Sequence, residues 1–280
     1  MALIDFILNL AGLLLWLNWR AVPFDPLATA TPATLVGTLR RTAPAGLRRW
    51  HFLAALGGLV LLRAFFYWLI GGAVDWTAKL DCIVITLSFR SDFLSRMILF
   101  SLLSFVAALG WFFLCLLLLS LLHFPGSDAS GWHRFVRLHL ARVDAFPRVV
   151  KGLLPLAVAG IGWWCLSWLL VRWELLPSPA SAARRVEQAS VLGLCSYLAW
   201  KHVIAGLLAV HLVNSYVYLG RHAVLKYFGE LAGRLLQPLR WLPLRAGRVD
   251  FAPLLGIVVV LLLGALMEWG LVRLYSQLGR

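Results

Sequence analysis

The chain has 280 residues, of which 61% are hydrophobic and 14% charged, and its mean hydropathy is +0.85. Soluble domains are nearer half apolar, with about a quarter of their residues charged. This composition excludes an ordinary soluble domain and indicates a membrane protein. The formal net charge of +14 resembles that of nucleic-acid-binding proteins, but the basic residues gather in alternate loops, which is a pattern of membrane topology.

Six apolar stretches are long enough to cross a membrane, because about 20 helical residues span roughly 30 Å of hydrocarbon. They are Leu3–Trp19, Phe52–Ala73, Met97–Leu122, Gly152–Val171, Ala189–Leu219 and Pro253–Tyr275. We expect the first to be a retained helix, since Asp5 stands where a signal peptide would be positive and Arg20 follows the apolar run. The predicted fold class is all-α, a polytopic membrane protein with six transmembrane helices.

Basic residues predict the orientation of these helices. Lys and Arg number five in residues 20–50, five in 123–151 and six in 221–251, against three each in 74–96 and 172–188. Basic loops stay in the cytoplasm, so we expect a bacterial inner-membrane protein with both termini on the outer, periplasmic side. The basic loops would also attract anionic lipid headgroups. No nucleic-acid partner is expected.

The alternation of loops divides the chain into three helical hairpins, which are residues 1–75, 97–173 and 189–277. Each consists of a helix, a basic cytoplasmic loop and a returning helix. Parts of these loops have an amphipathic pattern that suits the membrane interface. We therefore predict three successive hairpins joined by short outer loops.

A hexapeptide recurs before the returning helices of the second and third hairpins. It reads RVDAFP at residues 142–147 and RVDFAP at residues 248–253. The shared residues are Arg142, Asp144 and Pro147 in the first copy and Arg248, Asp250 and Pro253 in the second. Aspartate is a favoured N-cap, and proline is tolerated in the first helical turn. We predict that Asp144 and Asp250 cap these helices while the arginines reach lipid phosphates.

An amphipathic helix is predicted over residues 222–237, HAVLKYFGELAGRLLQ. Its apolar face consists of Val224, Leu225, Phe228, Leu231 and Leu235. Charged residues of alternating sign recur four residues apart on another face, which supports a helix. Next to a membrane, such a helix is expected to lie in the interface plane.

The segment after this helix contains Pro238, Arg240, Leu242 and Pro243, then Gly247, and then Asp250 and Pro253. It resembles the hallmark of the YggT/YlmG family of small integral membrane proteins. In that family a helical hairpin is joined by Pro-x-Arg, Leu-Pro, a glycine-containing turn and Asp-hydrophobic-Ser-Pro. The matching residues here are Pro238, Arg240, Leu242, Pro243, Gly247, Asp250, Phe251 and Pro253, with Ala252 in place of the serine. The match covers residues 200–275, and residues 97–173 resemble a degenerate copy. Relatives are associated with bacterial division, chromosome organisation, osmotic tolerance and haem attachment in plastids, and the resemblance implies no enzyme class.

One charge is predicted to lie deep in the membrane. Arg63 stands about 12 residues into the second apolar stretch, and an arginine there needs a partner or water. Counted from the cytoplasmic ends at 1.5 Å per residue, Arg63, Asp5 and Glu268 lie at depths of about 18, 20 and 22 Å. We therefore predict an ion pair of Arg63 with Asp5 or Glu268. It would be a structural lock or part of an ion path.

Catalytic and metal-binding motifs are missing from the sequence. It contains no HExxH, GxSxG, P-loop or GxGxxG, and its four cysteines are scattered without CxxC spacing. We therefore expect no enzyme, no metal site and no resident cofactor. Bis-histidine haem ligation between helices would need facing histidines, and only His202 and His211, in or near the fifth stretch, are candidates.

The function predicted from these features is that of a subunit or assembly scaffold of a larger membrane complex. Small residues would allow partner helices to approach closely, namely Gly57, Gly58, Gly71, Gly72, Gly160 and Gly162. Other integral membrane subunits, or further copies of the same chain, are the expected partners. Two alternatives stay open, an oligomeric transporter or channel, and a protein that handles haem or pigment.

Overall fold

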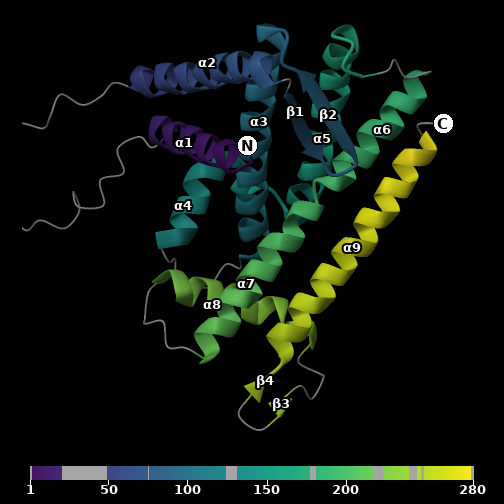
Figure 1. The fold of residues 1–280 in the computed structure, drawn as a ribbon. Coiled ribbons are helices and arrows are strands. Elements are labelled where there is room, and N and C mark those ends of the chain that lie inside the picture. Colours follow the sequence, from purple (N-terminus) through teal and green to yellow (C-terminus); the bar gives the residue numbers. More distant parts are fainter. Residues whose placement is uncertain are drawn as a thin grey trace, which may run out of the picture. The chain divides into compact units, whose positions relative to one another are not determined.

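Helices dominate the structure (Figure 1), and its described part contains six helical stretches long and apolar enough to cross a membrane, as predicted. The computed structural model describes residues 2–20, 49–74, 76–123, 131–176, 181–216, 223–239, 245–246 and 249–278. The candidate spans within this part are Leu3–Arg20, Arg49–Ala73, Leu94–Leu122, Arg148–Arg172, Ala182–Tyr216 and Ala252–Gln277. By the length and composition of these helices, the chain is a multi-pass membrane protein.

The helices alternate with short strands and turns along the chain. The α-helices are α1 (Ala2–Arg20), α2 (Arg49–Val74), α3 (Leu94–Leu122), α4 (Gly131–Leu140), α5 (Arg148–Arg172), α6 (Ala182–Cys195), α7 (Leu198–Tyr216), α8 (Ala223–Leu235) and α9 (Ala252–Leu278). The strands are β1 (Thr77–Cys82), β2 (Ile85–Arg90), β3 (Arg245–Ala246) and β4 (Val249–Asp250), and the 3₁₀ turns are η2 (Ala141–Ala145) and η3 (Gln237–Leu239).

The chain forms two compact units. Unit 1 consists of residues 1–80 and 88–109, and unit 2 of residues 81–87 and 110–280. In unit 1, α1 packs along α2 (Figure 1). In unit 2, α5 packs against α6 and α7 against α9. The arrangement of the spans as three hairpins, over residues 1–75, 97–173 and 189–277, stays a prediction.

A β-hairpin replaces the predicted loop between the second and third spans, so the all-α description is incomplete. Strands β1 and β2 pair in a two-stranded sheet, and apolar residues alternate with polar ones along β2, where Leu87 and Phe89 are buried. The Phe89 ring lies 5.6 Å from that of Phe100 on α3. This burial of one strand face is the usual source of hairpin stability.

Helices α5 and α6 approach each other closely because small residues face the contact. A Cβ built on Gly160 would lie 3.3 Å from the Ala189 backbone oxygen, and one on Gly193 only 2.8 Å from that of Leu156. Gly71 is similarly close to Ser91. The other glycines expected to permit close approach have no described atom outside their own helix within 4 Å of an added Cβ, namely Gly57, Gly58, Gly72 and Gly162.

Substitution of Gly193 by alanine is expected to lower the free energy of unfolding by about 1–3 kcal/mol, because a rigid backbone oxygen blocks the added methyl group. Gly162→Ala is the matched control, since alanine there meets open space and favours the helix. Denaturation of both variants in detergent micelles measures the difference. Equal effects at the two positions would contradict the packing described here.

The fifth predicted span, Ala189–Leu219, is two helices rather than one. Helix α6 begins earlier, at Ala182, and the chain breaks from α6 into α7 at residues 196–197. At the break, i to i−3 hydrogen bonds replace the i to i−4 bonds of the α-helix. The Ser196 N–H donates to the Gly193 backbone oxygen, and the Ser196 hydroxyl donates to the same oxygen at 2.6 Å. A side chain that competes for a carbonyl in this way bends a helix.

The amphipathic helix predicted over residues 222–237 is present as α8, but its apolar face covers protein. Leu231, Ala232 and Leu236 are buried, and a cluster that includes Ala232 and Leu236 packs on Leu208 of α7. A second amphipathic helix, α4, was not predicted, and its Val136 packs against α3. Both helices therefore bury part of their apolar surface within unit 2, and the expectation that α8 lies in the interface plane stays a prediction.

Candidate functional site

The predicted intramembrane ion pair is the centre of the strongest candidate site. Arg63, in the middle of α2, places its Nη2 2.5 Å from the Asp5 Oδ1 in the first turn of α1. The Arg63 side chain is 3% exposed and that of Asp5 is 23% exposed. A buried arginine is stable only with such a partner, so the structure contains the first of the two predicted pairings.

Polar side chains from three helices complete this site, here called the Arg63 cluster. Arg63 Nη1 donates to Asn9 Oδ1 at 2.8 Å, and Nη2 also donates to Ser104 Oγ at 3.0 Å. Asn9 Nδ2 donates to the same Ser104 oxygen at 3.0 Å. The Tyr67 hydroxyl donates to Asp5 Oδ1 at 2.6 Å. The cluster therefore ties α1, α2 and α3 together through charge-assisted hydrogen bonds.

The chemistry of the Arg63 cluster favours a fixed charge. The guanidinium carbon lies 5.5 Å and 5.3 Å from the ring centroids of Tyr67 and Phe100, within the range of cation–π attraction. Its Nε has no hydrogen-bond partner in the described part of unit 1. Because arginine keeps its proton in proteins, Arg63 is suited to hold helices rather than to transfer protons.

Glu268, the other partner considered for Arg63, pairs instead with Lys201. Lys201 Nζ lies 2.5 Å from Glu268 Oε2, which joins α7 to α9. Gly264, one turn before Glu268, provides the space for the lysine chain, since an added Cβ would lie 2.6 Å from Lys201 Cδ. The sequence shows that Lys201 lies within a predicted span, but not which carboxylate faces it.

Asp144 does not cap α5, which corrects the helix-cap prediction. The N-cap of α5 is Pro147, without a side-chain hydrogen bond, and Asp144 lies in η2, three residues earlier. Its Oδ1 accepts from the Ser120 hydroxyl at 2.5 Å and lies 3.4 Å from Lys151 Nζ, which donates to Ser120 Oγ at 2.8 Å. Asp144 is therefore the counter-ion of a buried lysine.

A buried tyrosine of α8 lies in the field of this charge. The Tyr227 hydroxyl is buried and has no hydrogen-bond partner among the described residues. Burial, and then the Asp144 charge, raise the pKa of Tyr227 to about 12, while Arg234 acts in the opposite direction. Arg234 Nη1 donates to the Leu122 oxygen at the end of α3, so α8 is held to α3 by this bond.

The raised pKa predicts that stability falls in alkali. Below pH 10 the hydroxyl is neutral in both states; between pH 10 and 12 the unfolded tyrosine ionises and the folded one does not. The free energy of unfolding should therefore drop by about 1.4 kcal/mol per pH unit in this window through Tyr227 alone.

Tyr227→Phe isolates this effect, because the difference in alkaline stability between the variant and the original chain reports the tyrosine alone. Near pH 7 the variant should be as stable as the original chain or more so, since no hydrogen bond to a described residue is lost. Denaturation curves at pH 7 and pH 11 measure both. If the free energy of unfolding falls equally between pH 7 and pH 11 in the two proteins, the prediction is refuted.

The histidines considered for haem do not face each other. His202 and His211 both belong to α7, where His202 is exposed and His211 partly buried. No group of three or more His, Cys, Asp or Glu residues in the described ranges could hold a metal ion. His139 of α4, which was not singled out from sequence, is buried with Nδ1 2.9 Å from the Phe135 oxygen, and its Nε2 has no partner among the described residues.

The family-motif residues are only partly described. Pro238 lies exposed in η3, Pro253 is buried in the first turn of α9, and Arg142 is exposed in η2. Arg240, Pro243 and Arg248 lie outside the described residues, and only the backbone of Asp250 is described, paired with Arg245 across β3 and β4. The predicted role of Asp250 as a cap stays a prediction.

Comparison of the chain with protein-family models, with curated proteins and with solved structures gave no match. The resemblance to the YggT/YlmG family therefore rests on the motif residues alone. The features of the chain that bear on its function are the arrangement of charges and the exposed surfaces described above.

Proposed function

We propose that this chain is a non-catalytic membrane protein that serves as a subunit or assembly scaffold of a larger membrane complex. The observation that carries the proposal is the pairing of three cations of the candidate spans with carboxylates. Arg63, Lys151 and Lys201 each bond a carboxylate on another segment. Charges on an ion path face water or substrate, whereas these three hold segments of the chain together.

The surfaces that remain for partners are apolar. Large hydrophobic side chains are exposed along the spans, including Leu3, Phe6 and Ile7 on α1, Phe65, Phe66 and Leu69 on α2, Ile161, Trp164 and Trp168 on α5, and Leu262, Leu263 and Leu266 on α9. In a membrane such faces contact lipid or the helices of another subunit, where packing rather than hydrophobicity selects the partner. They fit a protein that acts by association.

Membrane location and family complete the proposal. The excess of Lys and Arg in alternate loops supports a bacterial inner-membrane protein with both termini outside. The motif around Pro238 and Pro253 supports a relationship to the YggT/YlmG family, with an additional first hairpin. Labelling of single introduced cysteines tests the orientation of the chain. One cysteine is placed directly after residue 1 and another directly before residue 280, and each is labelled from either side of the membrane.

Extraction of the protein from its native membrane in mild detergent, at its natural abundance, tests the function. Particle size, absorbance and co-purifying chains are then measured. Stoichiometric partner chains would support the scaffold. An isolated, colourless homo-oligomer would refute it and direct attention to solute flux in liposomes, and visible absorbance would favour a haem- or pigment-handling protein instead.

A further inference from the structure

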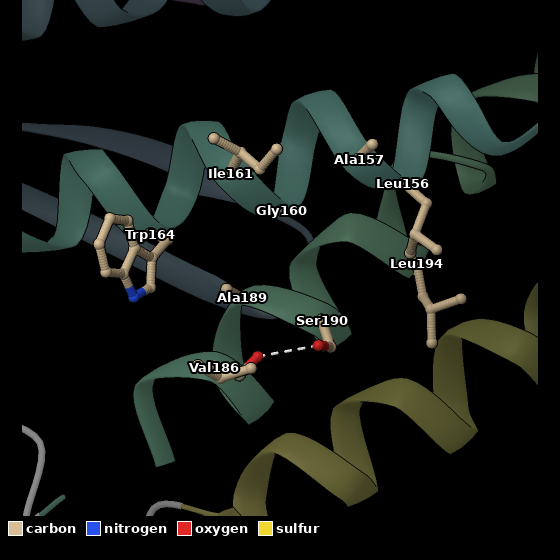
Figure 2. Close-up of a pocket in the computed structure, with 9 residues that line it drawn as sticks. All are labelled: Leu156, Ala157, Gly160, Ile161, Trp164, Val186, Ala189, Ser190 and Leu194. Carbon is tan, nitrogen blue, oxygen red and sulfur yellow. Dashed lines mark hydrogen bonds between the residues drawn. The ribbon is translucent and has the colours of Figure 1, made fainter. Parts of the chain in front are cut away.

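A groove runs between α5 and α6 in unit 2, with a volume of about 480 Å³ (Figure 2). Its lining is Leu156, Ala157, Gly160, Ile161 and Trp164 from α5 and Val186, Ala189, Ser190 and Leu194 from α6. Both walls belong to candidate membrane spans. The groove is of ordinary size for a ligand site, and such sites are mostly apolar.

The apolar lining of the groove favours a hydrocarbon ligand. Ser190 is its one polar side chain, and its hydroxyl donates to the Val186 oxygen at 2.8 Å, the dashed bond of Figure 2. Ile161 and Trp164 are 64% and 47% exposed, so described protein leaves this side of the groove uncovered. Within a membrane the occupant that suits such a surface is an acyl chain.

Arginines stand at one end of the groove. Arg172 is the last residue of α5, and Arg185 lies in the first turn of α6, one turn before Ala189 and on the same face. The helices are antiparallel here, since Gly160 faces Ala189 and Leu156 faces Gly193. Helical side chains lean toward the N-terminus of their helix, so these two guanidinium groups lean toward each other.

One buried group at this end lacks an acceptor. The Arg185 Nε is inaccessible to solvent and has no hydrogen-bond partner within the described residues. The carboxylate of Glu187 lines an adjoining groove, which shares Val186 and Ser190 with this one and continues to Leu274 and Gln277. Residues 172–188 contain three arginines, Arg172, Arg184 and Arg185, against Glu174 and Glu187, so their net charge is positive. Arginine suits phosphate oxygens.

We propose that this groove binds an acyl chain of an anionic phospholipid whose phosphate is held by Arg172 and Arg185. Trp164 lies eight residues from Arg172, or about 12 Å along the helix. This distance is within the depth of one leaflet of hydrocarbon, which is about 15 Å. An acyl chain that starts just below a phosphate held by the arginines therefore reaches the groove at Trp164. This site is independent of the scaffold role proposed above.

Titration of the delipidated full-length protein with dioleoylphosphatidylglycerol and dioleoylphosphatidylcholine tests the site by native mass spectrometry. The unmodified chain should bind phosphatidylglycerol at least tenfold more tightly. The R172Q/R185Q variant should lose that preference. Ala157→Phe, which fills the groove from an exposed position without altering charge, should weaken binding of both lipids. Arg273→Gln, at a span end on α9, should change neither.

Thermal unfolding without lipid shows that each variant is folded before its binding is compared. Equal affinity for the two lipids in the unmodified chain, or unchanged binding in both groove variants, would overturn the proposal. The proposal would also be overturned if the protein is a dimer that Ala157→Phe dissociates while lipid binding persists. The occupant of the groove would then be a second copy of the chain.

Discussion

Replacement of Asp5 by alanine is expected to lower the free energy of unfolding by about 3–5 kcal/mol, because it leaves the Arg63 guanidinium buried without a counter-ion. Arg63→Leu should cost less. The Asp5 carboxylate that remains is partly exposed and keeps the Tyr67 hydroxyl as a donor, whereas the arginine that remains in Asp5→Ala is buried and keeps its charge. Denaturation of the two variants in detergent micelles at pH 7 compares these losses directly.

The double substitution Asp5→Asn with Arg63→Met distinguishes a structural lock from an ion path. Asparagine still accepts the Tyr67 hydroxyl, and methionine fills the arginine volume, so stability should return to within about 1.5 kcal/mol of the original chain. If the cluster is a lock, solute flux in liposomes is the same for the original chain and the double variant. A folded double variant with altered flux would make Arg63 a pore residue.

The Arg63 cluster shows how far sequence alone reaches. Depth counting placed Arg63, Asp5 and Glu268 at similar levels, which was enough to name Asp5 as one of two candidate partners. Depth could not separate Asp5 from Glu268, because helix order and rotation decide which carboxylate faces the arginine. Ser104 and Asn9 carry no signal of their own, since polar residues of this size occur in many spans without forming a cluster.

The elements missed were those whose packing decides their conformation. Length and hydropathy predicted six spans, but the β-hairpin of residues 77–90 depends on burial of Leu87 and Phe89, which a short alternating pattern hardly reveals. The break in residues 182–216 follows from the Ser196 hydroxyl and from packing against neighbours. Helix α8 was predicted as amphipathic, but the pattern is the same whether lipid or protein covers the apolar face.

Asp144→Ala is expected to lower the free energy of unfolding by about 3 kcal/mol, as removal of one member of a buried ion pair does. The variant leaves the Lys151 ammonium, whose side chain is 9% exposed, with the Ser120 oxygen as its remaining described hydrogen-bond acceptor. An aspartate that merely capped a helix would contribute about 1 kcal/mol. The size of the loss, measured by chemical denaturation in micelles, therefore decides between the two roles.

Two further variants make this comparison specific. Asp92→Ala removes an exposed pair with Arg90 and should cost about 0–1 kcal/mol, because water screens that interaction. Lys151→Met should cost less than Asp144→Ala, since Asp144 keeps the Ser120 hydroxyl as a donor and methionine suits the buried site. If Asp144→Ala costs no more than Asp92→Ala, the lysine is hydrated in the membrane protein, and the charge pairing that carries the scaffold proposal loses one of its three members.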